Sequence, residues 1–321
     1  MDSAKALSCD TNFNMRIETV TSAQNRKIKD LQTLLEKSKA RSAAGLFVVE
    51  GQRELGHCLD AGFVPETLFV CGEVIARGAA GGAADLCGSD AASVKGLSRV
   101  GAEAGHLVGN IEGKAGLDAL VAKAEALNPS LTLVQIPAFL YEKVAYRGST
   151  EGIVAEMRSV PRRLEDLKLG LNPLVMVLES VEKPGNLGAV LRSADAAGVD
   201  AVILCDPLTD LWNPNLIRSS VGAVFSVQTA VCTSAQAIAY LKDKGIRIFT
   251  AQLQDSSWYY DCDMRLPSAI VMGTESTGLT PQWRDAASSH IKIPMLGKLD
   301  SLNVSVSAAV LLYEAVRQRS I

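Results

Sequence analysis

Apolar runs alternate with helix-like patterns along most of this chain, most clearly after residue 172. The continuous apolar run at 174–178 predicts a buried strand of a parallel sheet. Leu187, Val190 and Leu191 then recur at helical spacing, and Gly198 is a natural stop for that helix. The rhythm predicts an α/β domain with a mostly parallel sheet. Its further strands are expected at 201–205, 224–227, 246–251, 269–272 and 291–293, and its further helices at 214–222, 235–244 and 304–319.

A weaker α/β rhythm precedes this domain and predicts a second, smaller one. Ser22 fits the N-cap of a basic helix over 23–39. Helices are also expected at 53–61 and 117–127, and strands at 46–51, 67–70, 131–134 and 152–157. The predicted organisation is a flexible N-terminus (1–20), the small domain (21–158, with 72–128 hard to interpret and partly low-complexity), a linker (159–172) and the large domain (173–321).

Composition narrows the classes of protein that fit. Hydrophobic residues make up 48% of the chain and charged residues 21%, so it can bury a core. No apolar run reaches about 18 residues, so no membrane span is expected. The seven cysteines are scattered and form no CxxC pair, which favours reduced thiols in the cytoplasm and disfavours a zinc site.

The net charge of −3 disfavours a nonspecific binder of polyanions, but charge is uneven along the chain. Six basic residues and two acidic ones lie between Arg26 and Arg41. Such a segment fits a specific RNA contact. It fits a solvated helix surface equally well.

Three polar segments lie where strands pass into loops or helices: KPGNLG at 183–188, GTESTG at 273–278 and SLN at 301–303. Loops at strand ends are where α/β proteins place their chemistry. Taken singly, each segment has a structural explanation: Asn186 fits a helix cap, Arg192 a surface ion pair and Glu275 a loop carboxylate. The glycine fingerprints of dinucleotide sites and P-loops are absent, which disfavours a nucleotide-dependent oxidoreductase.

Taken together, KPGNLGAVLRSADAAG, VMGTESTGL and IPMLGKLDSLNVSVSAAVLLYEAVRQR resemble the three ordered motifs of the SpoU (TrmH) family of RNA ribose 2′-O-methyltransferases. The segment NPNLIRSSVG at 213–222 resembles the family's intervening helix. Residues 22–61, with QNR and FVVEG, resemble the small substrate-binding domain of many members. The resemblance is dense over 173–321 and looser over 20–70 and 130–158.

The resemblance implies a trefoil-knotted α/β (SPOUT) domain that binds S-adenosylmethionine in the knot, beside a smaller L30e-like α/β domain. It also implies a homodimer with its active site near the interface. Lys183 replaces an asparagine that is common in the family and adds positive charge near the RNA. Metal is not expected. The matching catalytic positions are Asn186, Arg192, Glu275, Ser301 and Asn303; the cofactor positions are Gly273, Ile293, Pro294, Met295 and Leu302; and the RNA contacts are Arg26, Lys27, Lys183 and Arg218.

The implied reaction is methyl transfer from a sulfonium to a ribose 2′-hydroxyl, which is largely a problem of positioning. The family mechanism often makes the arginine the base. Because a guanidinium normally stays protonated, Arg192 could instead bind the target phosphate through two hydrogen bonds. The predicted substrate is ribosomal RNA, with transfer RNA as the alternative. A non-catalytic RNA-binding homologue is the competing hypothesis, disfavoured by the intact motif positions.

Overall fold

The computed structural model describes residues 15–77, 114–145, 151–274, 277–298 and 301–320. The chain divides into two compact units, which are described separately. The N-terminal unit comprises residues 1–32 and 50–158, and the C-terminal unit comprises residues 33–49 and 159–321. Residues 33–49 therefore group with the second unit although they lie within the predicted small domain.

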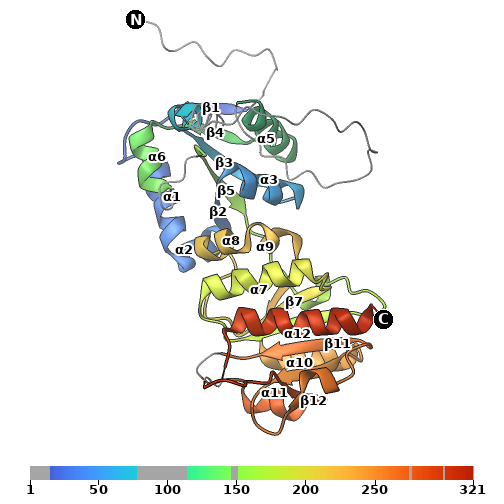
Figure 1. Ribbon diagram of the computed structural model, residues 1–321. Coiled ribbons are helices and arrows are strands. Elements are labelled where there is room, and N and C mark those ends of the chain that lie inside the picture. The colour runs from blue at the N-terminus through green and yellow to red at the C-terminus, as the bar shows by residue number, and fades with distance from the viewer. Residues whose placement is uncertain (1–14, 78–113, 146–150, 275–276, 299–300, 321) are drawn as a thin grey trace, which may run out of the picture. The chain divides into compact units, whose positions relative to one another are not determined.

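A mixed sheet has the strand order β1-β4-β3-β5-β2, and its first four strands form the centre of the N-terminal unit. β4 pairs in parallel with β1 and β3, whereas β3 and β5 are antiparallel. The strands are β1 (Arg16–Thr19), β2 (Leu46–Glu50), β3 (Pro65–Val70), β4 (Thr132–Gln135) and β5 (Ile153–Arg158). The helices of the N-terminal half are α1 (Arg26–Glu36), α2 (Ser38–Ala44), α3 (Gln52–Asp60), α5 (Lys114–Leu127) and α6 (Ala138–Val144) (Figure 1).

Two features of the N-terminal region differ from the sequence prediction. Residues 16–19, expected to be flexible, form the edge strand β1, and the Val20 N–H donates to the Gln135 carbonyl over 2.9 Å. Charged residues at 16 and 18 are typical of a protected sheet edge. The single basic helix expected over 23–39 is two helices, interrupted by an extended Lys37.

Glu156 of β5 is a buried carboxyl in this unit, with 8% of its surface exposed. Burial raises the pKa of Glu156 from its ordinary value of 4.5 to about 7, and the hydrogen bond with Thr67 opposes part of this shift. The negative charges of Asp30 and Glu66 add to the rise. The folded unit therefore holds a proton that the unfolded chain releases at lower pH.

The N-terminal unit should lose stability as the pH rises from 4.5 to about 7, because only the unfolded state is ionised at Glu156 in that window. The loss should total about 3 kcal/mol and be complete above the folded pKa. Glu156→Gln should remove this slope, whereas Glu66→Gln should keep most of it, because Glu66 is the smallest of the causes that raise the pKa of Glu156. Hydrogen–deuterium exchange of β3 and β5, compared between wild type and variants at each pH, measures the effect. An unchanged slope in Glu156→Gln would contradict the assignment.

A seven-stranded sheet forms the centre of the C-terminal unit, and every pairing in it is parallel. The strand order is β10-β12-β9-β11-β6-β7-β8. The strands are β6 (Leu174–Glu179), β7 (Ala201–Cys205), β8 (Thr229–Cys232), β9 (Arg247–Ala251), β10 (Ser257–Trp258), β11 (Ser268–Met272) and β12 (Ser289–Lys292). The α-helices are α7 (Pro184–Ala196), α8 (Pro214–Ser220), α9 (Ala223–Ser226), α10 (Ser234–Asp243), α11 (Pro281–Ala286) and α12 (Val304–Arg319).

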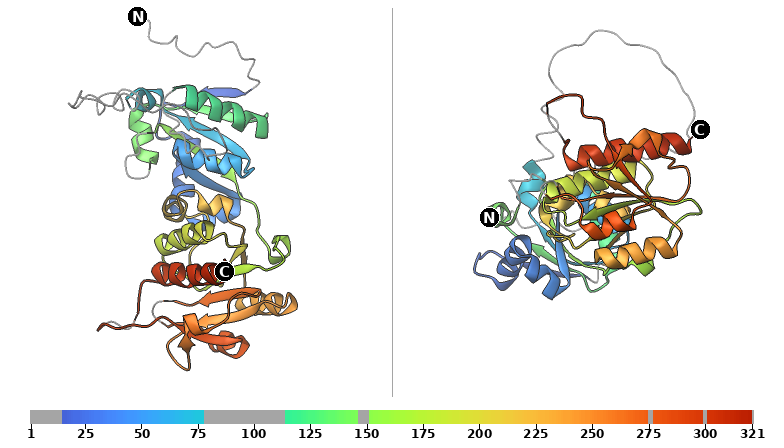
Figure 2. Two further views of the ribbon diagram at one scale, coloured as in Figure 1. Left: turned by 45° about the vertical axis from the view of Figure 1, so that its right-hand side comes forward. Right: turned by 90° about the horizontal axis from the view of Figure 1, so that it is seen from below.

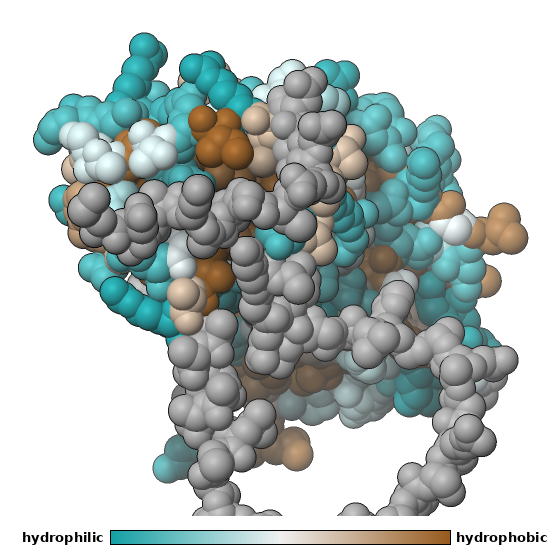
Figure 3. Space-filling view, turned by 90° about the horizontal axis from the view of Figure 1, so that it is seen from above, coloured by the Kyte–Doolittle hydropathy of each residue, from teal (hydrophilic) through white to brown (hydrophobic). Residues whose placement is uncertain are grey.

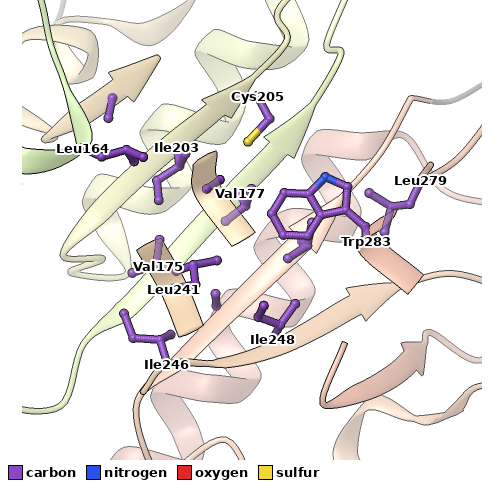
Figure 4. Close-up of a cluster of buried hydrophobic side chains, with 14 residues drawn as sticks. Leu164, Val175, Val177, Ile203, Cys205, Leu241, Ile246, Ile248, Leu279 and Trp283 are labelled. Atoms are coloured by element: carbon purple, nitrogen blue, oxygen red, sulfur yellow. The ribbon is translucent and has the colours of Figure 1, made fainter. Parts of the chain in front are cut away.

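Helices cover both faces of this sheet. α7 and α12 lie side by side on one face, and α10 and α11 cover the other (Figures 1 and 2). Alternate strand residues such as Val175 and Val177 point toward α10 and α11, where the fully buried Trp283 lies close to Leu279 (Figure 4). The strands are apolar on both faces because both faces are covered, which is why they read as continuous hydrophobic runs in the sequence.

The prediction of a strand at 224–227 is wrong. Residues Ala223–Ser226 form the short helix α9, and the strand is β8, a few residues later. Val221 and Gly222 both have positive φ, 52° and 92°, so the chain turns sharply after α8. Phe225 is buried in this turn, with its ring 6.2 Å from that of Phe47. A short apolar run cannot distinguish a strand from a buried helical turn.

Residues 33–49 contribute polar and aromatic contacts to the C-terminal unit. Arg41 is 3% exposed, and its Nε and Nη2 donate to the two carboxylate oxygens of Asp210 over 3.0 and 2.6 Å. Its Nη1 donates to the Leu34 carbonyl over 2.6 Å. Phe47 stacks on Trp212 with ring centroids 4.2 Å apart. Arg41 is therefore a buried structural residue and adds nothing to a basic surface.

Candidate active site

The carboxyl ends of the parallel strands meet at one edge of the C-terminal sheet, where open α/β sheets bind their ligands. Gly273 follows β11, and Ile293 follows β12, so both lie at this edge. Pro294 and Met295 continue from Ile293 and are half-buried, as are Gly273 and Ile293. Leu302 is more open, with 39% of its surface exposed. Four of the five predicted cofactor residues therefore lie at or just beyond two strand ends on the same edge.

The loop after β11 closes tightly on itself. The Gly278 N–H donates to the Thr274 carbonyl over 3.1 Å, and the Thr277 N–H donates to Thr274 Oγ1 over 3.0 Å. A Cβ added to Gly273 would lie 2.3 Å from the Gly278 carbonyl oxygen. Only glycine fits this approach without moving the loop. Glu275, the predicted catalytic carboxylate, lies outside the described residues.

Two asparagines from motifs 117 residues apart meet at the starts of α7 and α12: Asn303 Nδ2 donates to Asn186 Oδ1 over 3.3 Å. Asn303 is also the N-cap of α12, because its Oδ1 accepts the Ser305 N–H over 2.9 Å and the Ser305 hydroxyl over 2.6 Å. Both side chains thus lie at helix N-termini, where backbone N–H groups favour negative ligands.

Asn186 occupies a different position from the expected cap or loop. α7 begins at Pro184, with Lys183 as the N-cap residue, so Asn186 is in the first helical turn. Proline is favoured at the first position of a helix, which explains the earlier start. Arg192 is exposed further along the same helix, and Ser301 is exposed two residues before Asn303.

α7 is held close to α8 by a small residue. A Cβ on Gly188 would lie 2.8 Å from the Ser220 backbone nitrogen and 2.9 Å from the Leu216 carbonyl oxygen. These are backbone atoms, so a larger side chain at 188 would push the two helices apart. Gly188 therefore fixes the helix that carries Asn186 and Arg192.

The predicted RNA contacts are divided between the two units, and two of them take part in ion pairs. Arg26 Nε lies 3.5 Å from Asp30, and Lys27 Nζ lies 2.7 Å from Glu18. Lys183 and Arg218 are exposed on the C-terminal unit.

Sequence reasoning missed one buried carboxylate at the site edge. Glu179, the last residue of β6, is 2% exposed and accepts hydrogen bonds from the backbone N–H and hydroxyl of Thr280, over 2.8 and 2.6 Å. The sequence signal that could have identified Glu179 is an acidic residue at the end of a continuous apolar strand. Across the described ranges, no group of three or more His, Cys, Asp or Glu side chains could hold a metal, and no helix is long and apolar enough to cross a membrane.

The fold defines an α/β protein with a candidate ligand site at the carboxyl edge of a parallel sheet. The model of the SpoU rRNA methylase family matches residues 173–313, and that of the MRM3-like substrate-binding domain matches residues 25–98. A 23S rRNA (guanosine-2′-O-)-methyltransferase, RlmB, of Ralstonia nicotianae is 37% identical over 176 residues, which cover 53% of this chain and 71% of the relative. The chain belongs to the SpoU rRNA methylase family.

Solved structures agree with this assignment. The crystal structure of an RNA 2′-O ribose methyltransferase is 32% identical, with a TM-score of 0.68, and the match covers 94% of this chain and all of that one (100%). An AdoMet-bound rRNA methyltransferase from Sinorhizobium meliloti is 24% identical with a TM-score of 0.76, over 94% of this chain and 98% of that one. The latter likeness concerns the fold. The comparisons confirm the family that the three motifs resembled.

Proposed function

We propose that this protein transfers the methyl group of S-adenosylmethionine to a ribose 2′-hydroxyl of ribosomal RNA. The contact between Asn186 and Asn303 carries the proposal, because it joins the first and third motifs at the starts of α7 and α12. The name of the Ralstonia relative favours 23S rRNA as the substrate. Such a substrate, together with free cysteines, favours a cytoplasmic enzyme.

The residues at the carboxyl edge fit S-adenosylmethionine. Ile293, Pro294 and Met295 offer half-buried apolar surface for an adenine ring, and the backbone near Gly273 and Leu302 offers donors and acceptors. When bound, the cofactor supplies an activated methyl group on a sulfonium. We include in the proposal that the segment after β12 threads a trefoil knot around this site.

The protein side chains position the ribose and its phosphate. Arg192 projects from an exposed part of α7 and can bind a phosphate through two parallel hydrogen bonds. Asn186 and Asn303 orient the ribose hydroxyl through neutral hydrogen bonds, aided by Ser301. Glu275 keeps its predicted role of orienting Arg192 or loop amides. Proton removal falls to a transiently neutral Arg192, the residue to which the family mechanism often assigns this role, or to water.

Exposed apolar side chains on α12 support a homodimer. Val306 and Tyr313 lie seven residues apart, on the same helix face, and are 48% and 50% exposed. Leu302, at the start of the helix, extends this surface toward the proposed cofactor site. A partner subunit over this face would bury the stripe close to the active site. Light scattering during gel filtration tests the dimer, and a monomer at micromolar concentration would contradict it.

The N-terminal unit is proposed to recognise the shape of the RNA, together with Lys183 and Arg218. Its basic helix α1 contains Arg26 and Lys27. The described surface in the view from above is mainly hydrophilic, with smaller hydrophobic areas (Figure 3). RNA specificity generally comes from loop shape and unstacked bases, so a separate unit for recognition suits a structured target.

Mapping of 2′-O-methyl groups tests the substrate. Ribosomal and transfer RNA from cells with and without the protein should differ at one ribosomal nucleotide, and the purified protein should restore that mark with radiolabelled S-adenosylmethionine. A mark restored only in tRNA would replace the ribosomal assignment by the tRNA alternative. RNA binding without label incorporation would favour the non-catalytic homologue and overturn the enzyme assignment.

Gly273→Ala should weaken S-adenosylmethionine binding about tenfold or more, because the new Cβ forces Gly278 to move and reshapes the loop. Gly297→Ala is the control, since a Cβ there meets nothing within 4 Å. Isothermal titration calorimetry measures both affinities. Equal affinities in the two variants would show that the loop does not shape the cofactor site.

A further inference from the structure

We infer that Glu179 is a positioning residue for the cofactor loop, acting through Thr280; the inference rests on the proposed function. Glu179 ends β6, next to β11 in the sheet, and Leu178 pairs with Met272 in the register of the two strands. The loop that begins at Gly273 is thus fixed at its start by the β6–β11 ladder. Its far end needs a separate anchor.

Glu179 supplies that anchor. Thr280 follows the loop closely and is the N-cap residue of α11. Its backbone N–H donates to Glu179 Oε2 over 2.8 Å, and its hydroxyl donates to Oε1 over 2.6 Å. The Glu179 carboxylate therefore binds both the backbone and the side chain of Thr280, just after the end of the loop. The loop from Gly273 to Leu279 is held at both ends by β6.

The same carboxylate reaches a second helix. Ser234, the first residue of α10, is 1% exposed, and its hydroxyl lies 3.1 Å from Glu179 Oε1. The two Thr280 donors are a backbone N–H and a hydroxyl, whereas the single hydroxyl proton of Ser234 is shared between Glu179 Oε1 and the closer Asp206 Oδ2. The two hydrogen bonds from Thr280 thus occupy both oxygens of the buried Glu179 side chain. Glutamine would have the same shape but would turn one acceptor into a donor facing donors.

Asp206 provides a matched comparison. It follows β7 with φ 47°, and its Oδ2 accepts both the N–H and the hydroxyl of Ser234, over 2.9 and 2.8 Å. Asp206 therefore supports the start of α10 as Glu179 does. The contacts of Asp206 with Ser234 do not involve Thr280. A variant at 206 should disturb the shared helix start and spare the loop.

The test compares Glu179→Gln, Thr280→Val and Asp206→Asn for S-adenosylmethionine affinity by calorimetry and for melting temperature. Loss of a buried, charge-assisted hydrogen bond predicts that Glu179→Gln raises the cofactor Kd about tenfold or more. Thr280→Val keeps the N–H and loses the hydroxyl, so its increase should be about threefold. Asp206→Asn should lower the melting temperature comparably but change Kd by less than about twofold. The KM for RNA should stay near the wild-type value in all three.

The outcomes separate this inference from the proposed function. Wild-type protein without measurable S-adenosylmethionine binding would overturn both. Wild-type binding with equal Kd values in the three variants would overturn the positioning role of Glu179 alone. If Glu179→Gln does not fold, the Thr280→Val variant provides the test. A Kd of Thr280→Val for S-adenosylmethionine that is larger than the Kd of Asp206→Asn supports the inference. An equal or smaller Kd contradicts it.

Discussion

Replacement of Asn303 by aspartate should leave the stability of the C-terminal unit almost unchanged and reduce methyl transfer about 100-fold or more. Aspartate is as good an N-cap as asparagine, so it can still accept the Ser305 N–H at the start of α12. It cannot donate to Asn186 Oδ1, and a carboxylate there faces an acceptor instead. The substitution therefore separates the two roles of a single side chain.

Single-turnover methyl transfer and thermal unfolding measure these two roles. Asn303→Ala should lose both, with a stability cost of about 1 kcal/mol from the missing cap. Ser305→Ala removes only the hydroxyl that donates to Asn303, and should have a small effect on turnover. Near-normal turnover in Asn303→Asp would show that the contact with Asn186 is structural and not part of the chemistry.

Arg192→Lys should reduce methyl transfer by about 100-fold, with folding unaffected because the side chain is exposed. Lysine keeps the positive charge but cannot make two parallel hydrogen bonds to a phosphate, and it changes the position of any proton-accepting nitrogen. The loss should appear in single-turnover rates at saturating S-adenosylmethionine, with cofactor affinity unchanged.

A control for the loss of guanidinium geometry is available on α11. Arg284 is also exposed, and its Nη1 donates only weakly to Gln254, over 3.3 Å. Arg284→Lys should keep wild-type turnover. If Arg192→Lys behaved like this control, Arg192 would be neither the phosphate ligand nor the proton acceptor.

The parallel core was predictable because its strands are covered on both faces. Runs such as 174–178 and 201–205 are apolar throughout, and the structure places both as inner strands. The terminal helix at 304–319 was predicted with its observed bounds. Short elements were harder: β1 has a mostly exposed, charged pattern, and the apolar turn at 223–226 has no helical period.

Long-range polar contacts could not be predicted from the sequence, for a physical reason. A charged residue in a basic segment predicts a solvated surface, yet Arg41 is buried against Asp210. Glu179 likewise depends on Thr280, 101 residues away. No local sequence pattern identifies Asp210 as the partner of Arg41 or Thr280 as the partner of Glu179. The motifs indicated that Asn186 and Asn303 share a site, but only the family resemblance joined them, since no periodicity spans 117 residues.

The pairing of Arg41 with Asp210 has a consequence for synthesis on the ribosome. The two residues are 169 positions apart, so at ordinary elongation rates Arg41 emerges roughly 10 to 30 s before its partner. A similar interval separates the synthesis of Phe47 from that of its stacking partner Trp212. Helix α2 and strand β2 are thus synthesised well before the residues of the C-terminal unit against which Arg41 and Phe47 pack.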